Sequence, residues 1–567
     1  MKKEETNLNE QLVKAGKKDN LYLVYFGIGF LLFSFIGVFD IISNFSAPEA
    51  EISYFNLVIG IIFSIVALIC LIYIIVFLFI PKIILEIDFK NNQIIIHKAF
   101  KETKIINFKE IYFLKNSENT FTNYVFKYGT LRIFTHIGET IRVPFLTNSK
   151  ILKESLVFFL KLTDKTLYPT SKFKLFFIRI YHYSLAFVMN FIHYKKPKKF
   201  DKYDEIAKAL SKKKVKKVLL VESKTINRNS LDKDLKEALN NKKIQYEIFT
   251  DVKPNPTCQN VLEGKKTYKE NNCDAIIAIG GGSVLDASKG IAISINTKKD
   301  LIKFKGLFKV HHKLPLLVAI PTTCGTGSET TFVSVLTDEK ENVKFEIISN
   351  NITPKYVILD ENLIRDLPLH FVGSTSMDAL THALESYINI SRTKKSKKQS
   401  LQAIKLIKDN LLPVVNDEYN MTYKKNLLEA SFIAGQAFNR GLVGPIHALS
   451  HALGGKYNLE HGYLNSILLP RFLRVYLFFI YKDLAKISRY ANISNTNNDH
   501  IDALKLINYI EYVNDAFKFS PTIKELKKED IIELSKKAYK ESRLLYPSKY
   551  FVNLEMYQDI LISLLQQ

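Results

Sequence analysis

Two long apolar runs near the start of the chain stand out in its hydropathy pattern. Residues 21–39 and 52–81 contain no charged side chain. A helix of about 20 apolar residues spans the hydrocarbon core of a bilayer. A signal peptide is the alternative for the first run, but no cleavage-site pattern follows it and a stronger apolar run comes next. The pattern therefore predicts two transmembrane helices, at about 21–40 and 55–80.

The charges around the two runs predict their orientation. Lysines are frequent in residues 2–18, before the first run, and they return directly after the second. The connection between the runs contains Glu49 and Glu51 but no lysine or arginine. Positive residues stay on the cytoplasmic side of a membrane. We therefore expect residues 1–81 to form a cytoplasmic N-terminus and a two-span hairpin in the cell membrane, with the rest of the chain in the cytoplasm.

The hydrophobic period changes to two over residues 82–165. The alternation predicts strand pairs around turns at 90–92 and 137–138. Asn148 or Ser149 is a candidate cap for a following helix. This order of strands and helix resembles a bacterial PH-like domain. The alternative is a small β module that only separates the membrane from the next domain.

Residues 166–200 are both basic and aromatic. A basic amphipathic helix often lies on a membrane surface, so the lipid bilayer is one candidate partner of this segment. Packing on the following domain is the other possibility. The lysine and proline run at 195–199 is the best candidate for a domain boundary.

Strand and helix patterns alternate over residues 201–366, which predicts an α/β domain with a parallel sheet. Gly280, Gly281, Gly282 and Ser283 follow the apolar run AIIAI. Glycines in such a turn let backbone N–H groups approach a pyrophosphate at the start of the next helix. The turn is not the G-x-G-x-x-G sequence, and by itself it is also compatible with a merely tight connection.

A second loop rich in hydroxyl groups and glycine, PTTCGTGSE at 321–329, follows the apolar run LPLLVAI. Ligands of parallel α/β sheets bind at the carboxyl ends of the strands. Two such loops at neighbouring strand ends favour a nucleotide site, so we interpret residues 201–366 as a dinucleotide-binding domain.

Helical periodicity dominates residues 367–567 and contains a candidate metal site. Asp378 and His382 are four residues apart and share one helix face. His447 and His461 lie in the stretch IHALSHALGGKYNLEHG. One carboxylate and three imidazoles suit a single divalent transition metal.

A single histidine is more often a structural residue than a ligand. Yet three of only 12 histidines lie at 447, 451 and 461, among small residues. We expect Gly454 and Gly455 to interrupt the helix, so that the chain turns and returns His461 to the site. The cleft between the helical and nucleotide domains is the expected place for chemistry.

Composition excludes some classes of function. At 567 residues the chain is too long for one ordinary domain. Its net charge of +24 does not predict nucleic-acid binding, because lysine is spread over the whole chain and no nucleic-acid motif occurs. The four cysteines lack the spacing of a metal site or a disulfide framework, which indicates reduced thiols.

Four motifs in order, GGGSVLDASKG, IPTTCGTGSE, MDALTHALESY and HALSHALGGKYNLEHGYLNSILLP, resemble the iron-containing alcohol dehydrogenase family. The resemblance covers about residues 175–560. It implies a dehydroquinate synthase-like fold, with an α/β dinucleotide-binding domain followed by an all-α domain. It also implies that Asp378, His382, His447 and His461 bind Fe(II), or Zn(II) as in some members. Its implied nicotinamide dinucleotide contacts are Asn255, Gly280, Gly281, Gly282, Ser283, Asp286, Thr322 and Thr323.

One departure from the family pattern concerns the choice of cofactor. Family members commonly end the first strand with an Asp that binds the adenosine ribose, and here Ser223 occupies that position. Lys224 follows and would attract a 2′-phosphate, whereas Glu222 would bind a ribose if it turned inward. NAD and NADP both stay open, with NADP slightly favoured.

Together with the two predicted membrane spans, the resemblance predicts a membrane-tethered, metal-dependent alcohol dehydrogenase or aldehyde reductase. His451 matches the family histidine near the reacting carbon and is the candidate catalytic residue. The expected substrate is a small primary alcohol or aldehyde, including a lipid-derived one, and the chain is expected to form a homo-oligomer. Two alternatives remain: a glycerol-dehydrogenase-like or dehydroquinate-synthase-like enzyme that acts on a polar substrate, and a non-catalytic membrane sensor or scaffold that only binds nucleotide.

Overall fold

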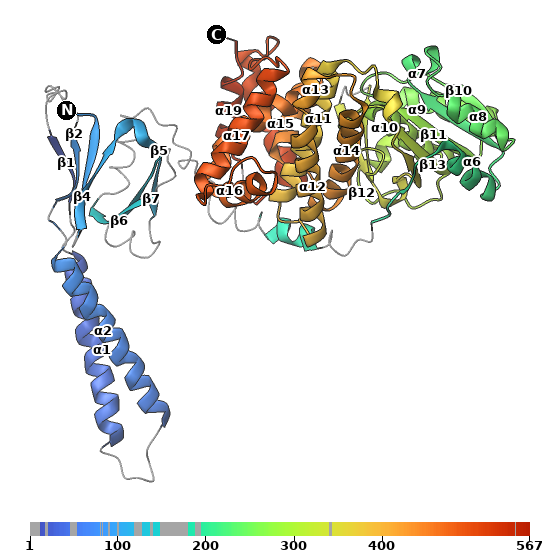
Figure 1. The fold of residues 1–567 in the computed structure, drawn as a ribbon. Helices are drawn as coiled ribbons and strands as arrows, with labels where there is room; N and C mark the ends of the chain where they lie inside the picture. Colours follow the sequence, from blue (N-terminus) through green and yellow to red (C-terminus); the bar gives the residue numbers. More distant parts are fainter. Residues whose placement is uncertain are drawn as a thin grey trace. The chain divides into compact units, whose positions relative to one another are not determined.

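The computed structural model describes most of the chain from residue 194 onward and separate segments before it. The described residues are 12–17, 21–45, 54–79, 81, 83–88, 91–98, 101–117, 128–135, 140–147, 178, 180–187, 194–339, 343–549 and 552–566. The chain divides into two compact units, Met1–Leu167 and Tyr168–Gln567, and each is treated on its own (Figure 1).

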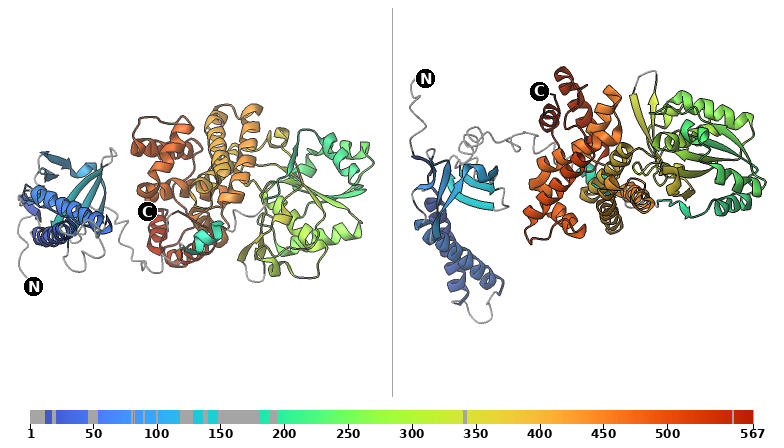
Figure 2. Two further views of the ribbon diagram at one scale, coloured as in Figure 1. Left: turned by 90° about the horizontal axis from the view of Figure 1, so that it is seen from below. Right: turned by 45° about the horizontal axis from the view of Figure 1, so that its top comes forward.

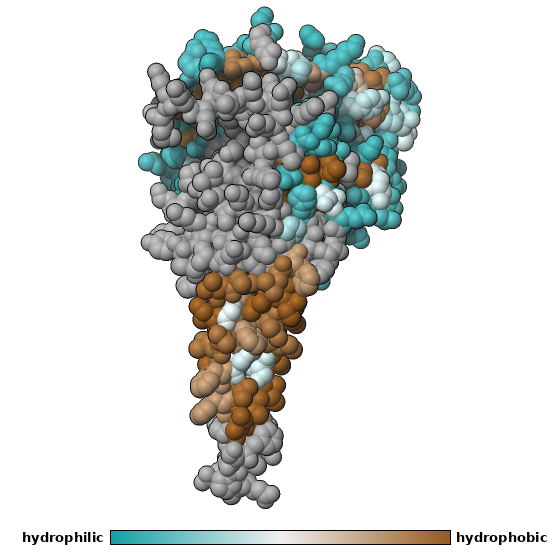
Figure 3. Space-filling view, turned by 90° about the vertical axis from the view of Figure 1, so that its left-hand side faces the viewer, coloured by the Kyte–Doolittle hydropathy of each residue, from teal (hydrophilic) through white to brown (hydrophobic). Residues whose placement is uncertain are grey.

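Unit 1 contains a pair of long apolar helices, α1 (Leu21–Phe45) and α2 (Tyr54–Leu78), which lie against each other. Their outer faces are apolar, and Leu31 and Phe35 expose 68% and 73% of their surface (Figure 3). Among the described residues, however, no helix has the length and apolar character needed to cross a membrane, so the two predicted spans are not confirmed.

Two antiparallel sheets complete the described part of unit 1. Their strand orders are β1-β2-β3-β4 and β5-β6-β7. The strands are β1 (Leu12–Lys17), β2 (Ile83–Asp88), β3 (Gln93–Lys98), β4 (Lys101–Asn107), β5 (Ile111–Ser117), β6 (Tyr128–Thr135) and β7 (Thr140–Thr147). Residues 91–92, part of the first predicted turn, form a turn between β2 and β3, whereas the second predicted turn, at 137–138, lies outside the described residues. Strand β1 was not predicted, and the PH-like resemblance is not confirmed. The predicted helix from Asn148 or Ser149 lies outside the described residues.

From Lys198 onward, unit 2 has the predicted parallel α/β arrangement. Its six-stranded sheet has the order β10-β9-β11-β13-β16-β8, and every neighbouring pair is parallel. The strands are β8 (Lys198–Phe200), β9 (Lys217–Glu222), β10 (Gln245–Phe249), β11 (Ala275–Gly280), β13 (Leu316–Pro321) and β16 (Tyr356–Ile358). Ile276 and Ile277 belong to different apolar clusters, which shows that the sheet is buried on both faces.

Helices cover this sheet, and a second small sheet stands beside it. The helices are α6 (Tyr203–Lys212), α7 (Lys224–Arg228), α8 (Lys233–Asn241), α9 (Cys258–Glu270) and α10 (Gly282–Ile295). The small sheet has the order β12-β15-β14 and consists of β12 (Gly306–Leu307), β14 (Val333–Asp338) and β15 (Val343–Ile348). It was not predicted, and it matters because its residues line the functional cleft.

The rest of unit 2 is a helical lobe that lies beside the α/β lobe in both views of Figure 2. Its helices are α11 (Leu369–Ile388), α12 (Lys394–Asn410), α13 (Pro413–Asn416), α14 (Met421–Gly441), α15 (Pro445–Tyr457), α16 (His461–Tyr490), α17 (Asp499–Ala516), α18 (Ile531–Leu545) and α19 (Leu554–Ile562). The predicted fold class for this part, an α/β domain followed by a helical one, is therefore confirmed, and the solved structures to which unit 2 is similar, described below, support it.

The turn that returns His461 to the site is not where the sequence suggested. Gly454 and Gly455 lie inside α15, which continues to Tyr457. A glycine within a helix costs only about 1 kcal/mol relative to alanine, so it need not end the helix. The helix ends at Asn458, whose φ of 53° is a left-handed conformation that asparagine tolerates.

Candidate metal and nucleotide site

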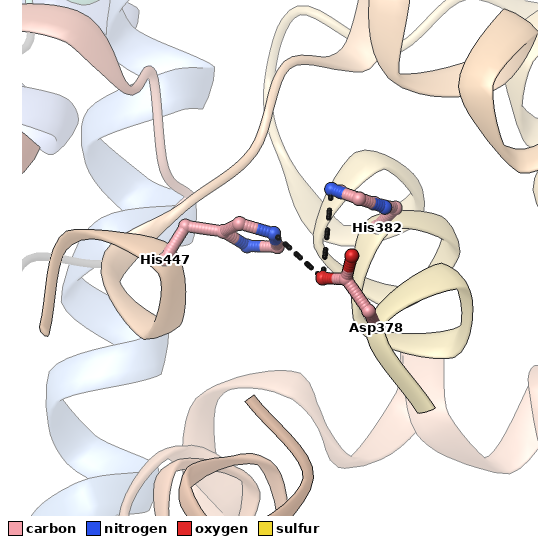
Figure 4. Close-up of side chains that lie close together, drawn as sticks. All are labelled: Asp378, His382 and His447. Atoms are coloured by element: carbon pink, nitrogen blue, oxygen red, sulfur yellow. Dashed lines mark ion pairs between the residues drawn. The ribbon is translucent and has the colours of Figure 1, made fainter. Parts of the chain in front are cut away.

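Three helices bring the four predicted metal ligands to one point. Asp378 and His382 lie one turn apart on α11, His447 lies on α15, and His461 is the first residue of α16. Figure 4 shows the first three side chains turned toward one another. Asp378, His382 and His447 are all buried.

The distances among these side chains fit ligands of a single ion. Oδ1 of Asp378 lies 3.8 Å from Nε2 of His382, 3.7 Å from Nε2 of His447 and 3.6 Å from Nε2 of His461. Ligand atoms about 2.1 Å from a tetrahedral metal lie roughly 3.4 Å apart. Asp378, His382 and His447 form the compact group able to hold an ion, and His461 is placed to complete it.

An amide that the sequence reading did not single out lies at the centre of this group. Nδ2 of Asn465 donates to Oδ1 of Asp378 at 2.7 Å and lies 3.2 Å and 3.1 Å from Nε2 of His447 and His461. Three of the four predicted ligands, Asp378, His447 and His461, thus place a ligand atom within 3.2 Å of one amide nitrogen. A bound cation requires the same convergence of ligand atoms on one point.

Glu385, one helical turn beyond His382, fixes the orientation of the predicted ligand His447. Its carboxylate accepts hydrogen bonds from the backbone N–H groups of Gly444 and Ile446, at 2.7 and 2.8 Å, at the start of α15. Nδ1 of His447 lies 2.6 Å from the same carboxylate. The bond leaves Nε2 of His447 free to face Asp378, so Glu385 sets the tautomer of a predicted ligand.

Electrostatics keeps two of the imidazoles in the form that binds metal. Burial lowers the pKa of His382 to about 4 and that of His461 well below its usual value, so both are neutral at pH 7. Burial alone would raise the pKa of Asp378, but the neighbouring imidazoles of His382 and His461 outweigh it and hold that pKa low. For His447, burial is outweighed by Glu385 and Asp378, which raise its pKa to about 9. Metal binding would therefore release its proton.

The glycine loop meets the second loop at the carboxyl edge of the sheet. The backbone N–H of Thr322 donates to the carbonyl of Gly280 at 3.0 Å. A Cβ on Gly281 would lie 3.2 Å from Thr323, and one on Gly282 would lie 2.6 Å from Thr326. Gly281 and Gly282 are needed because the two loops approach closely. Their backbone conformation does not require glycine, since neither has a positive φ.

Hydrogen bonds within the protein fix the side chains of two predicted nucleotide contacts, Asp286 and Asn255. Asp286 accepts from the hydroxyl of Ser328 at 2.6 Å and from the backbone N–H of Val335 at 3.1 Å. Asn255 donates to Asn458 at 2.8 Å and accepts from Lys344 at 2.8 Å, so it links the α/β lobe to the helical lobe.

One cavity of about 230 Å³ joins the two halves of the site. Its walls include Asn255, Gly282, Ser283 and Asp286 from the α/β lobe and all four predicted metal ligands from the helical lobe. Five of the predicted cofactor contacts do not line this cavity and lie instead at or near strand ends: Gly280, Gly281, Thr322, Thr323 and Ser223. A dinucleotide and a metal-bound substrate would meet here.

The chain is similar in sequence and fold to known proteins. The sequence model described as iron-containing alcohol dehydrogenase matches residues 199–361, and the model of the C-terminal part of the Fe-containing alcohol dehydrogenase family matches residues 372–562. A 1,3-propanediol dehydrogenase of Citrobacter freundii is 37% identical over 299 residues, which are 52% of this chain and 76% of that protein. The chain belongs to the iron-containing alcohol dehydrogenase family.

Two further similarities agree with this family. An NAD-dependent methanol dehydrogenase of Bacillus methanolicus is 32% identical over 335 residues, 58% of this chain and 86% of that protein. The solved structure of a 1,3-propanediol oxidoreductase superposes with a TM-score of 0.63 at 30% identity, covering 65% of this chain and 98% of its own. The chain is thus an oxidoreductase of the alcohol dehydrogenase type, and its family implies iron and NAD(H).

Within the candidate site of this alcohol dehydrogenase, His451 lies between the predicted metal ligands and an acidic group. Its ring stacks on His461 with the ring centres 5.1 Å apart. Nδ1 of His451 lies 2.7 Å from Oε1 of Glu541, and the hydroxyl of Tyr546 donates to the same oxygen at 2.7 Å. Burial would lower the pKa of His451, but Glu541 outweighs it and raises that pKa. No spacing in the sequence points to Glu541, which lies 90 residues away on α18.

At the cofactor end of the dehydrogenase site, Glu222 is fully buried and its Oε1 accepts from Nδ2 of Asn227 at 2.5 Å. It therefore does not turn toward a ribose. Ser223 caps α7 by accepting from the N–H of Ile226 at 3.3 Å. The side chain of Lys224 is 75% exposed and pairs with Asp251 at 3.1 Å.

Proposed function

We propose that the protein is a metal-dependent alcohol dehydrogenase or aldehyde reductase that uses a nicotinamide dinucleotide. The observation that carries this proposal is the cavity in which the glycine-loop residues Gly282 and Ser283 face the four predicted ligands. A hydride donor bound at the loop and an oxygen bound among the ligands would be brought together there. The expected substrate is a primary alcohol or aldehyde, including one derived from a lipid.

Asp378, His382, His447 and His461 would hold Fe(II), or Zn(II) in its place. When bound, such an ion acts as a Lewis acid that favours alkoxide or polarises a carbonyl. The residues of the chain supply the remaining functions. Glu385 fixes the direction of His447, the apolar walls exclude water, and His451 holds a proton beside the substrate oxygen with Nδ1 bound to Glu541.

The test of this proposal is turnover by the full chain reconstituted in lipid nanodiscs. We expect oxidation of NADPH or NADH, followed at 340 nm, with a panel of straight-chain aldehydes after loading with Fe(II) or Zn(II) under nitrogen. Glycerol and dehydroquinate-synthase substrates serve as the polar comparison. Absence of turnover with both metals and both cofactors, in protein shown to bind metal, would favour the scaffold alternative instead.

Without Glu541, the ring of His451 should lose its fixed orientation, whereas the metal should stay bound. We expect Glu541→Ala to lower kcat about tenfold to a hundredfold while KM changes little, because a positioned acid–base group contributes about that much. Glu541→Gln retains an acceptor for Nδ1 and should recover part of the loss. Steady-state kinetics and metal analysis of the same samples decide: an equal loss of metal and activity would show that Glu541 is needed only to build the metal site.

The cofactor end of the site supports a preference for NADP(H). Ser223 carries no negative charge to repel a 2′-phosphate, Glu222 is buried, and Lys224 is exposed beside it. We expect Lys224→Ala to lower kcat/KM for NADPH about tenfold, the effect of one charge-assisted hydrogen bond, and to leave the value for NADH within about twofold. Lys233→Ala, on the next helix, is the matched control. Equal effects on both cofactors would contradict the proposal.

The apolar helical pair of unit 1 supports attachment to a lipid bilayer. Large apolar side chains are exposed along both helices, among them Leu31, Phe35, Ile65 and Ile72. Burial of such surface in lipid is favourable, whereas exposure of so large a patch to water is rare in monomers. We propose a membrane-held enzyme with its catalytic unit in the cytoplasm, assembled as a homo-oligomer.

Flotation with vesicles tests the attachment. We expect the full chain to float with phosphatidylglycerol–phosphatidylcholine vesicles and the double variant Leu31→Lys with Phe35→Lys to lose most of this binding, because each buried lysine costs about 3 kcal/mol. Ile105→Lys is the control, since Ile105 is an exposed apolar residue (57%) on β4, outside the helical pair. Unchanged flotation of the double variant would exclude this pair as the attachment.

A further inference from the structure

A short helix that lies outside both family matches is part of unit 2. It comprises residues 178 and 180–187, whereas the first family match begins at residue 199. Ile178, His182 and Ala186 are buried at 8%, 1% and 5% exposure, at the spacing of one helix face. Tyr183, on the other face, is 61% exposed. The helix is thus packed on unit 2 by a defined face.

Two hydrogen bonds fasten this helix to the end of α18. The hydroxyl of Tyr181 donates to the carbonyl of Leu544 at 2.9 Å, and Nε2 of His182 donates to the carbonyl of Arg543 at 2.8 Å. Leu544 and Leu545, in this same stretch, line the catalytic cavity. The helix therefore sits against a segment that forms one side of the cleft.

The helix also contributes a wall of its own. Leu185 lines the same cavity as the four predicted metal ligands. It packs against an apolar cluster that contains Phe332 and Ile348, with Leu442 beside them, and these three side chains line the cavity too. Leu185 therefore forms part of an apolar section of the wall of the cavity that the four predicted metal ligands also line.

We propose that the helix at 178–187 completes the substrate pocket and that Leu185 makes the enzyme select alcohols and aldehydes with an apolar chain of several carbons. This inference rests on the proposed dehydrogenase function and adds the substrate class. The reacting oxygen is held at the metal ligands while the hydrocarbon chain lies against Leu185, Phe332 and Leu544. A polyol would leave its hydroxyl groups unpaired against these side chains.

The first experiment measures kcat/KM of the full chain in nanodiscs for the straight-chain aldehydes from propanal to octanal. Each added methylene buried by the pocket should raise kcat/KM, by up to about fourfold. Leu185→Trp fills the compartment and should reduce kcat/KM for octanal more than tenfold while propanal stays within about twofold. Leu185→Ala, a smaller change, should flatten the dependence on chain length. Equal effects of both variants on propanal and octanal, or none on either, would overturn the proposal.

The second experiment does not require turnover. The chain contains no tryptophan, so Leu544→Trp introduces a single tryptophan at the pocket wall, at a position 51% exposed, and leaves Leu185 in place. We expect octanol to shift its emission and propane-1,3-diol to have little effect. Tyr183→Trp, on the exposed face of the same helix, is the control and should not respond.

The turnover and fluorescence measurements test the dehydrogenase function and the apolar pocket separately. An octanol response of Leu544→Trp without turnover on any aldehyde would retain the pocket and reject the dehydrogenase function. Turnover without an octanol response at Leu544→Trp, or with an equal response from Tyr183→Trp, would retain the function and reject the pocket.

Discussion

Asp378→Ala is expected to abolish stoichiometric metal binding and to lower kcat/KM by about a thousandfold or more. The carboxylate is buried, and its Oδ1 is the atom that all three imidazole Nε2 atoms approach within 3.8 Å. Its removal deletes the only negative charge among the predicted ligands. A Lewis acid supplies several kcal/mol of transition-state stabilisation, and about 1.4 kcal/mol corresponds to a factor of ten.

Metal analysis and steady-state kinetics measure this effect on the same preparation. The control is Asp409→Ala, because Asp409 is a half-exposed carboxylate on α12 that pairs with Lys405 at 2.9 Å. It should retain metal and activity. Full activity of Asp378→Ala with its metal lost would show that the reaction does not depend on this site, and full metal content would show that Asp378 is not a ligand.

Glu385→Ala is expected to weaken metal binding about tenfold to a hundredfold, as loss of a carboxylate that orients a histidine ligand commonly does. The variant leaves Nδ1 of His447 without its partner and orphans the backbone N–H groups of Gly444 and Ile446. Each buried N–H left unpaired costs about 1–3 kcal/mol, so the free energy of unfolding should fall as well.

Titration with Fe(II) or Zn(II) separates the two effects of this variant. Activity should return at excess metal if the ligands remain and only their orientation is loosened. The control is Glu429→Ala, since Glu429 is half-buried on α14 and pairs with Lys199 at 2.5 Å. Unchanged metal affinity in Glu385→Ala would contradict the orienting role that we assign to Glu385.

The four predicted metal ligands could be found from the sequence because two of them are close together in it. Asp378 and His382 are one helical turn apart, and that spacing alone predicts a shared face. The stretch that contains His447 and His461 was predicted as well, but its turn was assigned to Gly454 and Gly455 instead of Asn458. Asparagine in a left-handed conformation at a helix end is a weaker sequence signal than a pair of glycines.

Other parts of the site depend on contacts between distant segments. Glu541 reaches His451 from another helix, and Glu385 bonds to backbone groups near residue 445, so no spacing connects these pairs. The small sheet of β12, β14 and β15 escaped prediction because β12 has only two residues and because β13, a strand of the main sheet, lies between β12 and β14 in the sequence. The helix at 178–187 was expected to lie on a membrane or on the next domain, and only packing places Leu185 in the cleft.

X-ray absorption at the metal edge, on the full chain loaded anaerobically with Fe(II), tests the central claim most directly. The account predicts one metal per chain, coordinated by nitrogen and oxygen at about 2.1 Å, with the histidine contribution reduced in His461→Ala. A chain that takes up no stoichiometric metal, or whose metal has sulfur ligands, would contradict it.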